Sequence, residues 1–178
     1  MKKFNKTQQL TLAGLFLAIG LILPSLFHAV PNAGKVFLPM HLPVLMAGLL
    51  LDPMYALAVG ILTPVLSNLV TGMPPTFPIL PIMVCELAAY GLFASILKHK
   101  AKLHYMVALI LSMLLGRIVG GLVAFVMTKA FALQLPPPHI WIWGSITTGL
   151  PGIVIQLILI PAIYFALNKY MKGNKDEA

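Results

Sequence analysis

The longest stretches of this chain without Asp, Glu, Lys or Arg are too long and too apolar for an ordinary soluble fold. They cover residues 7–34, 36–51, 53–85 and 130–168. A helix needs about 20 apolar residues to cross a bilayer, and three of the four stretches are longer than that. Charged residues make up 9% of the chain, where a soluble domain carries about 25%. The sequence therefore predicts an integral membrane protein. It excludes a soluble enzyme, a disordered chain and a nucleic-acid-binding domain.

Strong helix breakers divide the longest runs into separate spans. The run 53–85 contains Thr71-Gly72-Met73-Pro74-Pro75 and the run 130–168 contains Pro136-Pro137-Pro138, so each includes a loop. The join Asp52-Pro53 predicts a helix start, because proline suits the first position of a helix. We expect an all-α integral membrane protein, a compact bundle forming a single membrane domain over residues 1–178, with six transmembrane helices at about 8–27, 40–51, 53–71, 77–98, 104–131 and 145–170.

The basic residues are distributed unevenly between the two sides of this bundle. The chain has 12 Lys and Arg against 4 Asp and Glu, a net charge of +8. Nine lysines fall on one side, namely Lys2, Lys3, Lys6, Lys98, Lys100, Lys102, Lys169, Lys172 and Lys175. Cytoplasmic loops carry an excess of Lys and Arg, so we expect both termini in the cytoplasm. The alternative is a cleaved signal peptide over residues 1–30, which would leave five spans with the reversed charge bias.

A few polar side chains lie at membrane depth, and they come from five different predicted helices: His41, Asn68, Glu86, Arg117 and Gln156. Polar and ionisable groups at this depth are costly and usually functional. We therefore expect them to converge in a polar pocket that opens to the outer side.

Each of these residues also has a purely structural interpretation. Glu86 and Arg117 can form a buried ion pair between two helices, and Gln156 can bridge spans by hydrogen bonding. His41 can stabilise a helix start between two prolines. Asn68 can bond the backbone that the proline one turn earlier leaves free. The sequence leaves both interpretations open.

The loops on the predicted outer side are rich in proline and aromatic residues. The loop that begins at Pro136 carries both tryptophans of the chain, Trp141 and Trp143. Tryptophan is enriched at membrane interfaces, but a proline-stiffened loop over a cavity can equally cover a bound molecule. Trp141 and Trp143 are therefore candidate substrate-binding residues.

Two glycines beside Arg117 indicate close helix packing. Gly116 and Gly120 are one turn apart, and such a small-xxx-small pattern lets two backbones approach each other. This face can serve dimerisation or packing inside one chain, and in a six-helix bundle we expect internal packing.

Residue sets that carry catalysis or bind metals are missing from the sequence. There is no second carboxylate near Glu86, no pair of intramembrane histidines and no glycine-rich phosphate loop. No His, Cys, Asp or Glu cluster has the spacing of metal ligands, and the single Cys85 excludes an intramolecular disulfide. We expect no catalytic residue, no metal and no cofactor. If the chain moves a solute across the membrane, its energy would come from a partner or an ion gradient, and a carboxylate-rich proton relay is missing.

Three segments carry a resemblance to a known family: Phe37–Gly48 (FLPMHLPVLMAG), Leu62–Pro75 (LTPVLSNLVTGMPP) and Glu86–Gly91 (ELAAYG). Together they resemble the substrate-binding S components of energy-coupling factor (ECF) vitamin transporters, over nearly the whole chain. The resemblance implies a multi-pass protein of a bacterial cell membrane that captures a vitamin from outside. It also implies docking on a module of one transmembrane T component and two ABC ATPases.

The resemblance extends to a docking face and to a vitamin. Family members carry an Ala-xxx-Ala face on helix 1 that contacts the T component, and the matching positions here are Gly14 and Ala18. The chain is most similar to the pantothenate-specific type. Arg117, with amide and imidazole groups nearby, suits the carboxylate, hydroxyls and amide of pantothenate. Niacin, and cobalamin bound against the tryptophan loop, are the alternatives within the family. A stand-alone ion-coupled carrier or channel is the alternative from another class.

Overall fold

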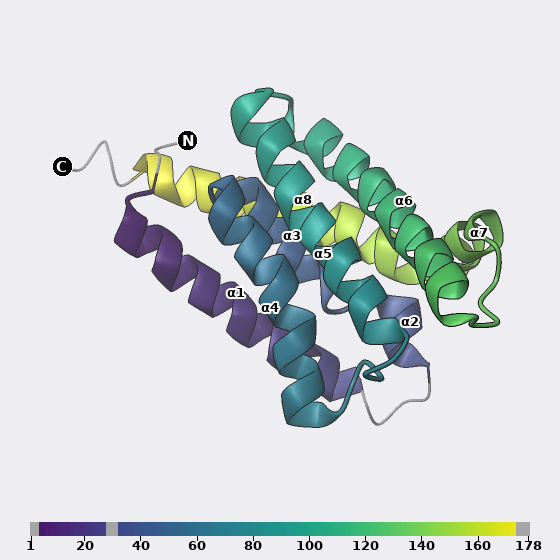
Figure 1. The fold of residues 1–178 in the computed structure, drawn as a ribbon. Coiled ribbons are helices and arrows are strands. Elements are labelled where there is room, and N and C mark those ends of the chain that lie inside the picture. The colour runs from purple at the N-terminus through teal and green to yellow at the C-terminus, as the bar shows by residue number, and fades with distance from the viewer. Residues whose placement is uncertain (1–3, 28–31, 174–178) are drawn as a thin grey trace.

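The computed structural model describes residues 4–27 and 32–173, and the regular structure of this part is entirely helical. The elements in chain order are α1 Lys6–Phe27, α2 Ala33–Phe37, α3 His41–Leu50, α4 Pro53–Thr71, α5 Ile79–Ser95, the π-helical turn η1 Ile96–Lys100, α6 Tyr105–Phe131, α7 Pro138–Thr148 and α8 Leu150–Gly173. Figure 1 shows the long helices packed side by side in one bundle, with the short α2 and α7 at the end away from the chain termini.

Within the described residues, six helical segments are long and apolar enough to cross a membrane. They are Lys6–Leu26, Ala33–Leu50, Pro53–Thr71, Ile79–Lys100, Tyr105–Phe131 and Leu150–Leu167. The predicted all-α bundle of six membrane-spanning helices is therefore confirmed. The cytoplasmic location of the termini stays a prediction from the lysine pattern, and Lys2, Lys3 and Lys175 lie outside the described residues.

Helix α3 forms the centre of the bundle. Nine of its ten residues are buried, and it contacts α1, α4, α5, α6 and α8. The other helices turn apolar side chains outward, for example Leu10, Met54, Leu69, Ile158 and Phe165. Helices that are apolar on the inside and on the outside are typical of a membrane environment.

The two ends of the bundle differ in charge. The basic end, defined by Lys6, Lys98, Lys100, Lys102 and Lys169, also holds the connection between α3 and α4. At this end the Gln9 side chain joins α1 to that connection. Its Nε2 donates to Asp52 Oδ2 at 2.8 Å, and the Asp52 backbone N–H donates to Gln9 Oε1 at 2.8 Å. Helix α4 begins at Pro53 as expected, but the Asp52 carboxylate bonds α1 and does not cap α4.

The region after α6 differs from the sequence-based expectation. The expected loop between 131 and 145 is helical from Pro138, and the expected single helix 145–170 is two helices, α7 and α8. Pro138 stands in the first turn of α7, where its missing N–H is not needed. At the other end of α7, the Gly149 N–H bonds Ser145 O. The proline run that predicted a loop therefore ends a loop and starts a helix. A second difference is the short helix α2, which lies where a loop was expected.

Candidate functional site

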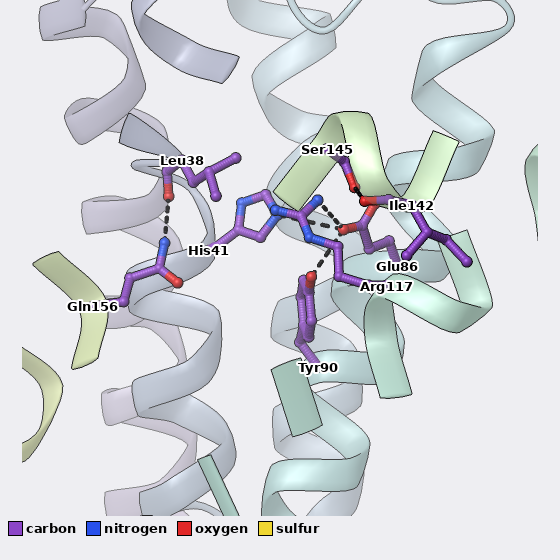
Figure 2. Close-up of polar contacts among 8 residues, drawn as sticks. All are labelled: Leu38, His41, Glu86, Tyr90, Arg117, Ile142, Ser145 and Gln156. Carbon is purple, nitrogen blue, oxygen red and sulfur yellow. Dashed lines mark hydrogen bonds and ion pairs between the residues drawn. The ribbon is translucent and has the colours of Figure 1, made fainter. Parts of the chain in front are cut away.

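A buried cluster of ionisable and polar side chains lies at the meeting point of α3, α5 and α6. The Arg117 Nη1 donates to Glu86 Oε1 at 2.6 Å, and the Tyr90 hydroxyl donates to the same oxygen at 2.9 Å. The His41 Nε2 lies 3.8 Å from that oxygen. Figure 2 shows the Glu86 carboxylate reached by Arg117 and Tyr90, with the His41 ring pointing toward the Arg117 guanidinium and that carboxylate. Of the five polar residues expected to converge, the structure brings His41, Glu86 and Arg117 together in this cluster.

Local sequence positions these side chains. Glu86 and Tyr90 are one turn apart on α5 and share a face. That face meets the glycine face of α6. A Cβ added at Gly116 would collide with the Tyr90 ring, and one added at Gly120 would lie 2.7 Å from Glu86 Oε2. The expected internal packing of Gly116 and Gly120 is confirmed, because these glycines leave the space that the Tyr90 ring and the Glu86 carboxylate fill.

Several nitrogen atoms of the cluster have no hydrogen-bond partner. Both ring nitrogens of His41 and the Nε of Arg117 are buried and make no hydrogen bond. The two residues are 5% and 8% exposed, so these nitrogens are shielded from bulk solvent. A buried polar group without a partner is costly. The cluster is therefore able to bond an incoming polar group.

A cavity of about 160 Å³ lies against this cluster. Its polar lining is His41, Tyr90, Arg117 and Gln156, and its apolar lining is Ile110, Met113, Leu114, Ile146, Ile153 and Leu157. The apolar part comes from α6, α7 and α8. Glu86 does not line the cavity; it holds Arg117 from behind. The cavity thus combines an aliphatic wall with a few polar groups, which is the usual composition of a small-molecule site.

Gln156 serves the cavity and the fold together. It is 1% exposed, and its Nε2 donates to the carbonyl oxygen of Leu38 at 3.2 Å (Figure 2). Leu38 ends α2 in the left-handed backbone region, with φ of 50°. The bond fastens the α2–α3 connection to α8, three residues before His41. Gln156 is therefore a bridge between spans that also lines the cavity.

Three other candidate residues are not brought to the cavity. Asn68 donates to Pro74 O at 2.7 Å and to Thr76 Oγ1 at 3.2 Å, so it stabilises the loop after α4 and does not bond the backbone near Pro64. Trp141 packs in a separate apolar cluster with α5 and α6 residues. Trp143 is 66% exposed. The amide of Asn68 lies next to a proline-rich loop, where nearby oxygen atoms accept its hydrogen bonds. The two tryptophans lie on α7 but do not line the cavity.

One polar residue of the cavity lining escaped the sequence analysis. Tyr90 lies in the segment that carries the family resemblance, but it was not singled out as a site residue. The signal that could have found it is its spacing, because residue i+4 from an intramembrane carboxylate lies on the same helix face.

The two candidate docking residues lie on the surface of α1. Gly14 and Ala18 are exposed and one turn apart, so they share a face. A Cβ added at Gly14 meets no other atom of the chain within 4 Å. This face is free of internal packing.

Among the described residues, no group of three or more His, Cys, Asp or Glu could hold a metal ion.

Comparisons with curated proteins and with solved structures gave no match. The family profile described as "ECF transporter, substrate-specific component" matches residues 8–164. This match covers most of the chain, including every residue of the cluster and the cavity. The chain therefore belongs to the family of ECF transporter substrate-specific components.

Proposed function

We propose that this chain captures a small anionic vitamin, with pantothenate as the best candidate, and delivers it to an ATP-driven energy-coupling module. The observation that carries the proposal is the buried cluster of His41, Glu86, Tyr90 and Arg117 at the wall of a mostly aliphatic cavity. Membership of the family supports a substrate-specific transport subunit that associates with a T component and ATPases.

The donors and walls of the cavity favour a carboxylate with a short branched body. The unpartnered Nε of Arg117 suits a carboxylate oxygen, since charge-assisted bonds are the strong ones. His41 and Gln156 suit hydroxyl and amide groups. The aliphatic side chains of α6 and α8 suit the two methyl groups of pantothenate. Nicotinate would use fewer of these groups, and the cavity of about 160 Å³ is too small for cobalamin.

Delivery depends on a partner in this proposal. Gly14 and Ala18 form the small, uncovered face on α1 that is proposed to contact the T component, where two helices approach closely. The termini are proposed to be cytoplasmic, in a multi-pass protein of a bacterial cell membrane.

The test is identification of the ligand on the purified full chain. Mass spectrometry of the small molecule that copurifies, followed by calorimetric titration with pantothenate, nicotinate and cobalamin, should give one carboxylate vitamin with high affinity. Trp143→Ala is the matched control, since this side chain is exposed and outside the cavity; its affinity should equal that of the wild type. Preferential binding of cobalamin would contradict the proposal. Ion-driven accumulation by the chain alone in liposomes would favour a stand-alone carrier.

A further inference from the structure

The charges around the cavity cancel when His41 is neutral. The groups that face His41 are Glu86 and Tyr90 from α5 and Arg117 from α6. The other helices packed on α3 carry their described titratable side chains nearer the basic end, at Lys6 on α1, Tyr55 on α4, and Tyr164 and Lys169 on α8. Lys35 and His139, on α2 and α7, are exposed. One guanidinium and one carboxylate therefore leave the empty site with no net charge.

An anion that enters such a site changes this balance. The Glu86 carboxylate already neutralises Arg117, so a ligand carboxylate beside Arg117 would leave one uncompensated negative charge. That charge would be buried among aliphatic side chains, where an unpaired ion is strongly disfavoured. A second positive charge within the cluster removes the penalty.

His41 is the side chain placed to supply that charge. Neither ring nitrogen has a hydrogen-bond partner, and Nε2 lies 3.8 Å from Glu86 Oε1. An imidazolium donates from both nitrogens, so one N–H would face Glu86 and the other would be available to a ligand. Glu86, in contrast, already accepts bonds from Arg117 and Tyr90 as a carboxylate, which favours its ionised form.

We propose that an anionic ligand binds this site together with one proton, and that His41 takes up the proton. The inference rests on the proposed function and adds the charge state of the bound complex. The negative charge of the ligand and the positive charge of the proton cancel, so the complex with the neutral site has no net charge. Because the complex holds one more proton than the free site, affinity rises as the pH falls. The rise is about tenfold per pH unit wherever free His41 is neutral and bound His41 is charged.

The experiment compares an anion with its neutral analogue on the full chain. Titration calorimetry in two buffers of different ionisation enthalpy measures the protons taken up. Pantothenate should bind with uptake of about one proton. Panthenol, in which an alcohol replaces the carboxylate, should bind with none and with an affinity independent of pH.

Two variants assign the proton. His41→Gln should abolish proton uptake and reduce the low-pH affinity for pantothenate to the weak high-pH level of the wild type. Glu86→Gln leaves a permanent positive charge on Arg117, so pantothenate should bind without a proton and without pH dependence. His139→Gln is the matched control, because it removes an exposed histidine of α7 outside the cavity; it should keep the wild-type profile. Melting curves verify that each variant is folded.

Pantothenate binding without proton uptake by the wild type would overturn the inference and leave the proposed function standing. A His41→Gln variant whose affinity for pantothenate keeps the wild-type dependence on pH would show that a group other than His41 takes up the proton. Absence of binding by pantothenate and by nicotinate at every pH would remove the proposed function and the inference together.

Discussion

The guanidinium of Arg117 and the carboxylate of Glu86 are 2.6 Å apart, and each side chain is less than one tenth exposed. Each therefore serves as the counter-charge of the other inside the bundle. Removal of one partner of a buried pair typically costs about 3–5 kcal/mol, because the remaining charge is uncompensated.

The first prediction tests this pair by a double-mutant cycle. Arg117→Met and Glu86→Gln should each lower the free energy of unfolding, Arg117→Met by about 3–5 kcal/mol because it leaves the buried carboxylate without its counter-charge. The double variant should be more stable than the sum of the two changes implies, since neither charge remains. Denaturant or thermal unfolding of the purified variants measures the effect. Simple additivity would mean that the two groups do not stabilise each other.

The second prediction separates binding from stability at Arg117. Arg117→Lys keeps the charge that Glu86 needs, but the ammonium has no Nε and no planar fork. We expect only a small change in melting temperature, together with at least a tenfold loss of pantothenate affinity, about 1.4 kcal/mol. Calorimetric titration beside a melting curve gives both values. A variant with full affinity would place the ligand away from the guanidinium.

The third prediction concerns the glycines of α6. Gly116→Ala and Gly120→Ala should each destabilise the protein by about 1–3 kcal/mol, because the added methyl group overlaps the Tyr90 ring or the Glu86 carboxylate. Gly144→Ala on α7 is the control, since a Cβ there meets nothing within 4 Å. Alanine has the higher helix propensity, so this control should be neutral or slightly stabilising. Equal tolerance at the three positions would argue against tight packing of α5 on α6.

The fourth prediction concerns docking through α1. Gly14→Leu and Ala18→Leu should reduce vitamin uptake by cells that contain the complete transporter, and should leave affinity for the ligand unchanged. The reason is that a bulky side chain keeps a partner helix at a distance. Ala58→Leu on the exposed part of α4 is the matched control and should transport normally. If ligand affinity of the α1 variants collapsed as well, the face would belong to the internal fold.

Much of the fold was predictable because lipid imposes strict rules on a chain. Uncharged runs of sufficient length indicate spans, and Asp52-Pro53 and Gly72 mark the two ends of α4. Gly72 indeed ends that helix with a positive φ of 73°. The region of α7 could not be predicted, because a run of three prolines is compatible with a loop and also with the first turn of a helix.

The site was predictable to the extent that polar groups are rare at membrane depth. His41, Arg117 and Gln156 stand out for this reason, and all three line the cavity. Tyr90 did not stand out, because its ring is compatible with apolar surroundings and only the hydroxyl needs a partner. Asn68 was a candidate for the same reason, although its side chain bonds only the loop that follows α4. Sequence alone does not show whether an amide has a local carbonyl within reach.

Helix α3 has a consequence for how the protein is assembled. Helix α3 alone rises only about 15 Å, half the thickness of the hydrocarbon core, so the span Ala33–Leu50 reaches across the membrane only together with α2. Nine of the ten residues of α3 are covered by protein, so lipid contributes little to holding α3 in place. Its insertion is therefore supported by the neighbouring helices, and a polar residue such as His41 is tolerated at its start for the same reason. Loss of a neighbouring helix would therefore expose a short span that begins with the polar His41.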